Sequence, residues 1–310
     1  MRLNSDNKPH VAVVGSADLE FSLPVPHIPA PGDSLFADRM DMQPGGKASN
    51  ICSALAVLGA RVFLFSCVGM DSYGAQILYG LKKRRVNVDF VERIDQPTGL
   101  VHNIRDPAGN RIRIMTPGAA QKMSATSLFQ GKAMLSSCQL MIVLSDVSEE
   151  AFLFAINAAH HFRLPVLAVP SPAERFKREW IGKLDLVVAG PAEARTITGA
   201  RLINLESADS ALNWFLKSGC GAAVLYLGRH GAAGSSALRD SFYCPAPLPS
   251  GITTPESEDV FIAALAYCLC SGLSLKESCT FAATAAWRMN SAAADAPFPS
   301  LSQIGSALTV

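Results

Sequence analysis

Short apolar runs alternate with segments of helical spacing over residues 140–227, and this alternation constrains the fold more than any other feature of the chain. Apolar runs of this length, bounded by turn residues, are typical of buried strands. The expected strands are 140–144, 165–169, 184–189 and 222–227, and the expected helices are 149–161, 191–198 and 207–218. Strands and helices that alternate in this way are typical of a parallel sheet covered on both faces. We therefore expect an α/β fold with a doubly wound, mostly parallel sheet flanked by helices.

In the first half of the chain, expected strands and helices also alternate, and further β segments are added. Strands are expected over 10–16, 35–42, 61–68 and 86–88, and helices over 50–58 and 75–85. Residues 100–105 and 111–115 flank a turn-forming stretch, which predicts a β-hairpin. No shift in composition marks a linker. We therefore expect one domain over residues 1–310, with segments near 17–42 and 97–117 inserted as a small β lid.

The composition limits the partners and the compartment. The chain is 49% hydrophobic and 17% charged, and its net charge of +1 gives no reason to expect nucleic acid or an anionic membrane as a partner. The eight cysteines are scattered, mostly in apolar runs, and no Cys-x-x-Cys pair indicates a structural zinc site. Free thiols and a polar start without a signal-peptide core predict a reducing, cytoplasmic location. The apolar run 260–270 is too short to span a bilayer and predicts a buried helix.

Residues 44–50, which read Pro-Gly-Gly-Lys-Ala-Ser-Asn, lead directly into an expected helix. Two adjacent glycines let the backbone approach a ligand closely, and the free N–H groups of a helix start can donate to it. The alternative is an ordinary Gly-Gly turn in which Ser49 or Asn50 caps the helix. Both interpretations are open at this point.

Further segments follow this one in a fixed order. They are residues 28–33 (Ile-Pro-Ala-Pro-Gly-Asp), 68–74 (Val-Gly-Met-Asp-Ser-Tyr-Gly), 97–99 (Pro-Thr-Gly), 109–111 (Gly-Asn-Arg), 118–119 (Gly-Ala), 227–231 (Leu-Gly-Arg-His-Gly) and 253–259 (Thr-Thr-Pro-Glu-Ser-Glu-Asp). In this order and spacing, residues 10–290 resemble the ribokinase-like (PfkB) carbohydrate and nucleoside kinases. The resemblance implies the doubly wound fold, a β lid, and ATP and Mg²⁺ as cofactors.

The resemblance also implies a substrate pocket formed by Gly45, Gly46 and Asn50, with an acid at the end of the first strand. The family usually has Asn-x-Asp there, where the Asp holds sugar hydroxyls. This chain has Asp18 at the Asn position and Glu20 at the Asp position, so either carboxylate is a candidate. The alternative interpretation is that both are solvated loop carboxylates.

On the phosphate side, the family motif reads Asp-Thr-x-Gly-Ala-Gly-Asp. Its final Asp, the general base toward the attacking hydroxyl, corresponds to Asp259, while Glu256 and Glu258 replace the two glycines. A β carbon obstructs close approach of a phosphate, two carboxylates repel it, and losing one oxyanion donor typically costs ~10²–10³ in rate.

Two interpretations of these glutamates remain open. In the first, Thr254 is an N-cap, Pro255 occupies the first turn, and the glutamates complete a favourable helix start that fills the anion hole. In the second, a glutamate carries Mg²⁺ and so bridges to the phosphates. The two residues therefore belong to the nucleotide side of the site in either case.

Two more features belong to the nucleotide side. The family's Asn-x-x-Glu, which supports the metal and phosphate region, reads Gly190-Pro-Ala-Glu193 here, so the Glu is a metal-side candidate and the Asn is lost. Gly228 and Gly231 resemble the family's nucleotide-side Gly-x-x-Gly. Thr253 replaces the Asp that opens the second motif.

Two functions from different classes follow. The first is ATP-dependent phosphorylation of a hydroxyl on a sugar or nucleoside, with Asp259 as the base. The second is a weak or inactive relative that binds a sugar or nucleoside as a sensor or regulatory partner. An NAD(P) site is disfavoured because no Gly-x-Gly-x-x-Gly follows the first strand. Aliphatic residues in the lid hairpin are compatible with a homodimer formed through the lid.

Overall fold

The computed structural model describes residues 8–129, 131–202, 204–237, 239–247, 254–292 and 296–307. Its centre is a nine-stranded sheet in the order β13-β12-β11-β10-β9-β8-β1-β4-β5. The strands are β1 (His10–Val14), β4 (Arg61–Gly69), β5 (Val91–Ile94), β8 (Leu140–Leu144), β9 (Val166–Val169), β10 (Leu186–Ala189), β11 (Ala222–Tyr226), β12 (Ala232–Ser236) and β13 (Arg239–Cys244). Neighbours from β5 to β11 are parallel, and β12 and β13 are antiparallel. The doubly wound, mostly parallel sheet is thus confirmed.

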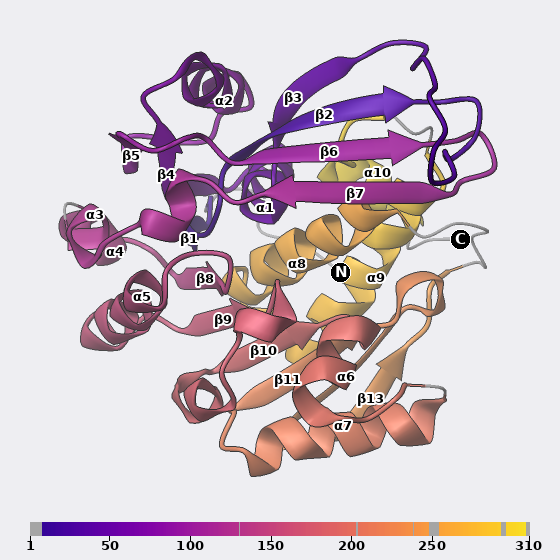
Figure 1. Ribbon diagram of the computed structural model, residues 1–310. Coiled ribbons are helices and arrows are strands. Elements are labelled where there is room, and N and C mark those ends of the chain that lie inside the picture. The colour runs from indigo at the N-terminus through magenta and orange to yellow at the C-terminus, as the bar shows by residue number, and fades with distance from the viewer. Residues whose placement is uncertain are drawn as a thin grey trace.

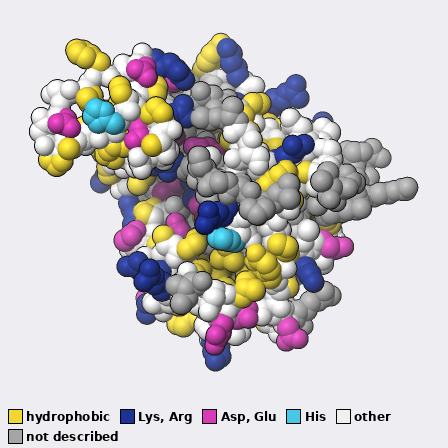
Figure 2. Space-filling view, turned by 90° about the vertical axis from the view of Figure 1, so that its right-hand side faces the viewer, with side chains coloured by type: hydrophobic (Ala, Val, Ile, Leu, Met, Phe, Trp, Pro, Cys, Tyr) yellow, Lys and Arg dark blue, Asp and Glu magenta, His cyan; other side chains and the backbone are white. Residues whose placement is uncertain are grey.

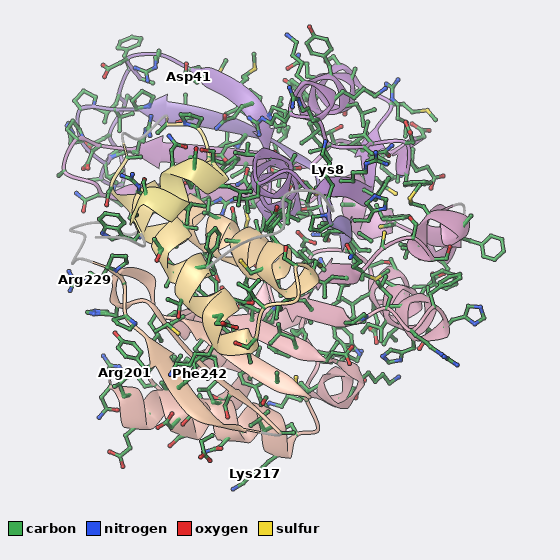
Figure 3. The ribbon with its side chains drawn as sticks, turned by 180° about the vertical axis from the view of Figure 1, so that it is seen from behind. Lys8, Asp41, Arg201, Lys217, Arg229 and Phe242 are labelled. Carbon is green, nitrogen blue, oxygen red and sulfur yellow. The ribbon has the colours of Figure 1, made fainter. Side chains whose placement is uncertain are left out.

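Helices cover both faces of this sheet (Figure 1). Alternate side chains of β1 show why: Val11 and Val13 belong to one buried cluster, and Ala12 and Val14 to the other. Helices α1 (Lys47–Val57), α2 (Ser72–Lys83), α8 (Pro255–Cys270), α9 (Leu275–Asn290) and α10 (Leu301–Ala307) pack on the first cluster. Helices α3 (Ala125–Phe129), α4 (Lys132–Leu135), α5 (Glu149–His161), α6 (Pro191–Thr198) and α7 (Leu205–Lys217) pack on the second. Figure 3 shows the yellow C-terminal helices lying across the first face.

A second, four-stranded sheet in the order β3-β2-β6-β7 forms the lid. Its strands are β2 (Asp18–Pro24), β3 (Asp41–Gly45), β6 (Leu100–Arg105) and β7 (Arg111–Thr116). In Figure 2 the lid overhangs a hollow whose walls carry basic and acidic side chains. Pairing registers place polar residues on the lid face that lines this hollow, since alternate residues of a strand share one face: Glu20, Ser22, Asp41, Gln43, Asn103, Arg105, Arg111 and Arg113.

Some expected elements are wrong in detail. Residues 35–40 form no strand, and β3 begins only at Asp41. Residues 86–88 contribute one isolated bridge, between Asn87 and Phe63, and the strand beside β4 is β5 instead. The strand β2 lies within the segment near 17–42 that was predicted to belong to the β lid, but it was not predicted as a separate strand, although Asp18, Glu20 and Ser22 alternate there with apolar residues. Pairing with β3 and β6 decides its conformation rather than local propensity.

The eight cysteines are all free thiols, and six of them are buried. No disulfide therefore contributes to holding the described elements together. Within the described ranges, none of the helices combines the length and the apolar character that crossing a bilayer requires.

Candidate active site

The two glycines of residues 44–50 lie directly against the two candidate carboxylates. A β carbon on Gly45 would lie 2.7 Å from Glu20 Cβ and 2.9 Å from Glu20 Oε2. A β carbon on Gly46, which has φ +83°, would lie 2.9 Å from Asp18 Oδ2. Any side chain at these positions would collide with a carboxylate, so the close packing of β3 on β2 requires both glycines.

Neither carboxylate is a solvated loop residue, because both stand on strand β2. Glu20 is 6% exposed, and its Oε1 accepts a hydrogen bond from Asn103 Nδ2 at 3.1 Å. Asp18 Oδ2 accepts one from Ser16 Oγ at 2.8 Å, and burial raises the pKa of Asp18. The structure thus brings Gly45, Gly46 and both carboxylates together at one place.

Helix α1 joins the first motif to the second. It begins at Lys47, and its N-cap residue is Gly46, which has no side chain to cap the helix. The alternative prediction, a cap by Ser49 or Asn50, is therefore wrong. Asn50 instead points its amide at the second motif and donates from Nδ2 to Asp259 Oδ2 at 2.9 Å. Lys47 Nζ lies 3.2 Å from Asp259 Oδ1. Both oxygens of Asp259 are therefore held by residues of the first motif.

The environment of Asp259 tunes its proton affinity. Burial raises the pKa of this carboxyl to about 6, with Glu258 and Glu256 acting in the same direction, while Lys47 and Asn50 lower it. Burial alone would lower the pKa of Lys47, but the carboxylates of Glu258 and Asp259 outweigh it and raise that pKa well above its usual value. An aspartate with a pKa near 6 and a fixed orientation is suited to accept a proton near neutral pH.

Glu258 stands in the first turn of α8. Its Oε2 lies 2.6 Å from Lys47 Nζ, so the ammonium bridges Glu258 and Asp259. A β carbon on Gly190 would lie 3.3 Å from Glu258 Oε1 and 2.7 Å from Glu193 Oε2. An Asn at this position would force Glu193 Oε2 to shift and would press against Glu258 Oε1. Gly190 and Glu258 therefore form one coupled departure from the family pattern.

The start of α8 agrees only in part with the expected helix cap. The helix begins at Pro255 with Thr254 as the N-cap residue. The Thr254 side chain, however, makes no capping hydrogen bond to the helix; its backbone N–H donates to Asn290 Oδ1 at 2.8 Å. Ser257 Oγ lies 2.8 Å from the hydroxyl of Tyr226 on β11. Contacts with α9 and β11 thus position the start of α8. Thr253, which replaces the Asp that opens the family's second motif, lies outside the described residues.

Asp146 was missed by the sequence reasoning. It follows β8, and its carboxylate accepts from the Ser16 N–H at 3.1 Å and lies 2.8 Å from Ser16 Oγ. A hydroxyl has one proton to donate, so its simultaneous contacts with Asp18 and Asp146 need a proton on one carboxyl. Burial, with the charge of Asp18, raises the pKa of Asp146 to about 7. The available signal was its place after a parallel strand, where ligands bind in such sheets.

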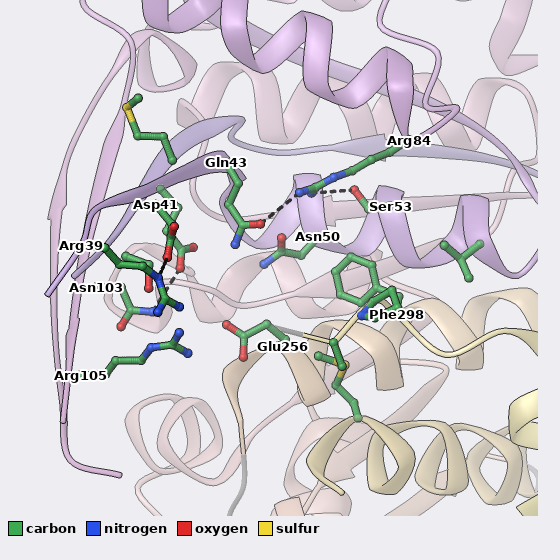
Figure 4. A pocket seen from close by; sticks show the side chains of 17 residues that line it. Arg39, Asp41, Gln43, Asn50, Ser53, Arg84, Asn103, Arg105, Glu256 and Phe298 are labelled. Carbon is green, nitrogen blue, oxygen red and sulfur yellow. Dashed lines mark hydrogen bonds and ion pairs between the residues drawn. The ribbon is translucent and has the colours of Figure 1, made fainter. Parts of the chain in front are cut away.

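Two cavities border the Asn50–Asp259 pair. The first, here called the base cavity, has a volume of about 340 Å³ and is lined by Asp18, Lys47, Arg113, Asp146, Glu193, Glu258 and Asp259, among others. The second, the lid cavity, has a volume of about 580 Å³ and is lined by Glu20, Gln43, Asn50, Arg84, Asn103 and Glu256, among others (Figure 4). Gly45, Gly228 and Gly231 do not line either cavity, but the other eight of the eleven site residues predicted from the sequence line one or the other: Asp18, Glu20, Gly46, Asn50, Glu193, Glu256, Glu258 and Asp259.

Gly228 and Gly231 line neither cavity. They bound a short 3₁₀ turn, Gly228–His230, between β11 and β12. Gly231 has φ +97°, and a β carbon there would lie 2.1 Å from the carbonyl oxygen of Cys244. The backbone conformation of this turn therefore requires glycine at Gly231. Contact of Gly228 and Gly231 with a nucleotide stays a prediction.

The donors near Asp259 fit a metal ion only with help from a ligand. Among the described residues, no group of three or more His, Cys, Asp or Glu side chains is arranged to hold one. Burial and the nearby Glu258 raise the pKa of Glu193. Mg²⁺ usually binds through one or two carboxylates and substrate phosphates, so Glu193 and Glu258 are sufficient protein donors only when phosphates supply the rest.

Comparisons with known proteins find similar sugar and nucleoside kinases. The chain is 28% identical to ribokinase of Schizosaccharomyces pombe over 284 residues, which covers 88% of this chain and 89% of that protein. It is 26% identical to pseudouridine kinase of Escherichia coli over 284 residues, or 89% and 88% of the two chains.

Solved structures show the same fold. The structure of Arabidopsis thaliana ribokinase complexed with ribose and ATP matches 98% of this chain and 100% of its own, with a TM-score of 0.85 at 21% identity. Ribokinase from Thermotoga maritima matches 97% and 99% of the two chains, with a TM-score of 0.83 at 23% identity. The model of the pfkB family carbohydrate kinases matches residues 8–301. The chain therefore belongs to the pfkB family of carbohydrate kinases.

Proposed function

We propose that this protein transfers the γ-phosphoryl group of ATP to a hydroxyl group of a sugar or nucleoside. The observation that supports this most is the buried Asp259, whose two oxygens are held by Asn50 and Lys47 at the N-terminal end of α8, beside the base cavity. Catalysis of phosphoryl transfer consists mainly of positioning and charge stabilisation. A fixed base, an ammonium and a helix N-terminus at one point provide groups for both.

In this proposal the acceptor hydroxyl lies against Asp259, which takes its proton as the oxygen attacks phosphorus. Asp18, Glu20 and Asp146 accept hydrogen bonds from the other hydroxyls of the substrate. Lys47 stabilises negative charge on the transferred group, a role that requires it to leave Glu258 in part. ATP would extend from the base cavity toward Gly228 and Gly231, and Mg²⁺ bound to its phosphates would be held by Glu193, directly or through water.

The pH dependence of kcat/KM tests the role of Asp259. The base must be ionised, and its pKa is about 6, so activity is expected to fall by about tenfold per pH unit below that value. Lys47→Met should move the midpoint to higher pH, because the ammonium lowers this pKa. Glu258→Gln should move it to lower pH, because the Glu258 carboxylate raises it. A midpoint that neither variant moves would assign the titration to another group.

A second function is favoured by one observation. The Glu258 carboxylate is bound to Lys47 at 2.6 Å, so the groups that would meet an incoming phosphate already neutralise one another. A protein with this arrangement would bind a sugar or nucleoside as a sensor or regulatory partner and transfer phosphate slowly or not at all. The two functions share the substrate site and differ at the start of α8.

Isothermal titration of ATP, with and without Mg²⁺, separates them. The same samples are assayed for ADP release with a panel of sugars and nucleosides. Mg²⁺-dependent micromolar binding with turnover would support the kinase. Binding of a sugar or nucleoside without any nucleotide binding would contradict the kinase and support the sensor. We propose a cytoplasmic location for either function, since the eight thiols are free.

We also propose that two copies associate through their lids. Met42 on edge strand β3 and Ile114 on edge strand β7 are 49% and 54% exposed. Exposed apolar edge strands favour pairing with another chain. Sedimentation equilibrium should give a dimer for the native protein, and Ile114→Lys should shift it to monomer without loss of secondary structure. A monomer at tens of micromolar would contradict this proposal.

A further inference from the structure

One serine joins two carboxyl groups in the base cavity. Ser16 follows β1, Asp18 opens β2 and Asp146 follows β8, so three separate segments meet at this point. Ser16 Oγ lies 2.8 Å from Asp18 Oδ2 and also 2.8 Å from Asp146 Oδ2, and the Ser16 backbone N–H donates to Asp146 Oδ1 at 3.1 Å. Asp18 and Asp146, here called the carboxyl pair, therefore share one hydroxyl group.

The carboxyl pair lacks one hydrogen-bond donor. A serine hydroxyl has one proton, so Ser16 can donate to only one member of the pair. The other Oδ2 would then face a lone pair of Ser16 Oγ at 2.8 Å, which is unfavourable unless a proton lies between the two atoms. A proton on one carboxyl group supplies this donor. Burial, together with the charge of Asp18, raises the pKa of Asp146 to about 7, so Asp146 is the member that binds the proton near neutral pH.

The charges beside the carboxyl pair are consistent with one bound proton. Burial raises the pKa of Asp18 and the charge of Glu20 acts in the same direction, while Ser16 and Arg113 lower it. Arg113 of β7 lines the same cavity, so it offsets one of the two negative charges that the pair would carry when fully ionised. A proton offsets the other charge.

The other charged groups of the base cavity lie toward α6 and α8. Within the described ranges they are Lys47, Glu193, Glu258 and Asp259. Lys47 Nζ lies 2.6 Å from Glu258 Oε2 and 3.2 Å from Asp259 Oδ1, so its ammonium is engaged with α8. Arg175 lies behind the loop after β8 and donates to the carbonyl oxygen of Val147 at 3.2 Å.

Glycine backbone packs against the carboxyl pair outside the cavity. A β carbon on Gly46 would lie 2.9 Å from Asp18 Oδ2, and one on Gly99 would collide with Asp18 Oδ1. A β carbon on Gly15 would lie 3.3 Å from Asp146 Oδ1. Backbone packing this close leaves no room for another side chain. A further donor to the pair therefore comes from the base cavity, whose volume of about 340 Å³ is within the range of small-molecule sites.

We propose that the carboxyl pair binds two hydroxyl groups of the substrate, and that these hydroxyls take the place of the shared proton, which is released to solvent on binding. The proposal rests on the substrate site of the proposed function. Hydrogen bonds to an ionised carboxylate are stronger than those to a neutral carboxyl group and favour the charged form, so two hydroxyl donors lower the proton affinity of the pair. The O–H bond of the acid breaks, the proton passes to the buffer, and Ser16 continues to donate to one carboxylate. The group recognised here is thus a diol of a sugar or of the ribose of a nucleoside.

Calorimetric titration without ATP tests the proton release. D-ribose, D-fructose, D-glucose, uridine and adenosine are titrated into the full-length protein at pH 7 in two buffers of different ionisation enthalpy. The probe that binds most tightly should release about half a proton, because a pKa of about 7 leaves the pair half protonated at this pH. Its affinity should rise about fivefold from pH 6 to pH 7 and about twofold from pH 7 to pH 8. Proton uptake, an affinity that is constant or falls with pH, or no binding of any probe would overturn the proposal.

Asp146→Asn assigns the released proton to the carboxyl pair. The amide can donate to Ser16 Oγ as the acid does, but it has no proton to release, so both the release and the pH dependence of affinity should disappear. Both should persist in Asp259→Asn, because the base is not a member of the pair. Asp209→Asn on α7 makes the same chemical change outside both cavities and should behave as the native protein. Proton release that survives Asp146→Asn, with or without a loss of affinity, would contradict the proposal.

Ser16→Ala provides a second test that does not depend on whether Asp146→Asn folds. Its midpoint of the pH dependence should move to higher pH, because the serine hydroxyl lowers the pKa of both members of the pair. An unchanged midpoint would mean that another group titrates, and the proposal would fail. Loss of ADP release with intact proton release would contradict the kinase function alone.

Discussion

Asp259→Asn is expected to lower kcat by about 10²–10⁴-fold with little change in substrate affinity, since a positioned general base contributes about that much. The amide keeps the size of the side chain and retains one oxygen to accept from Asn50, but it cannot take a proton. The carboxylate it replaces is 4% exposed and is held by two residues of the first motif. The measurement is ADP release at saturating substrate, with binding followed by calorimetry.

Asp209→Asn on helix α7 is a suitable control, because it makes the same chemical change outside both cavities. It should leave kcat unchanged. If Asp259→Asn retained more than about a third of the native kcat, Asp259 would not be the base. Asp146, whose pKa is about 7, would then be the next carboxylate to examine, since it lines the same cavity.

Replacing Glu256 and Glu258 together by Gly is expected to raise kcat by about 10²-fold, the typical contribution of one oxyanion donor. The change removes two negative charges from the helix start and opens the backbone N–H groups to a phosphate. It also frees Lys47 from its 2.6 Å contact with Glu258. Initial rates of ADP release with the panel of sugars and nucleosides provide the measurement, and KM for ATP should fall in parallel.

Glu206→Gly is the matched control for this pair, because Glu206 also stands in the first turn of a helix and is exposed. It should weaken its helix slightly and leave the rate unchanged. A double variant with native or lower kcat would contradict the idea that the glutamates obstruct phosphoryl transfer. Gly190→Asn should lower stability, since a β carbon at position 190 would lie 2.7 Å from Glu193 Oε2 and 3.3 Å from Glu258 Oε1, and loss of Glu258 should relieve only the second contact.

Much of the fold could be predicted from the chain alone. The strands of residues 140–227 were correct to within two residues, because buried parallel strands have a continuous apolar pattern that local sequence reveals. The lid strand β2 could not be predicted in the same way. Its polar face lines a cavity while Leu19 and Phe21 on its other face are buried in the core, and pairing with β3 and β6 decides its place in the lid.

For the site, the resemblance of the two motifs predicted Asp259 as the base and Gly45, Gly46 and Asn50 as the substrate side; the structure brings Asn50 and Asp259 together, and the roles stay predictions. The assignment of Thr254 as the N-cap residue and of Pro255 to the first turn is confirmed, but the Thr254 side chain makes no capping hydrogen bond and lies against Asn290 of α9 instead. Asp146 was missed, since a single acid after a strand carries little information by itself. The sequence showed that Glu256 and Glu258 replace two glycines of the family motif, but it did not show that Lys47 pairs with Glu258.

The sequence by itself determined the mostly parallel sheet and the helices between its strands, because these depend on local apolar patterns. It also determined two helix starts, that of α1 after Gly45 and Gly46 and that of α8 with Glu256 and Glu258. Only the tertiary structure decided what meets there. It placed Lys47 between Glu258 and Asp259, which are more than 200 positions further along the chain, and made room for Glu258 at Gly190. It also placed Arg105 of β6 opposite Arg111 of β7. Charged side chains interact when they lie within a few ångströms of one another in space, so their positions in the sequence do not reveal which of them form pairs.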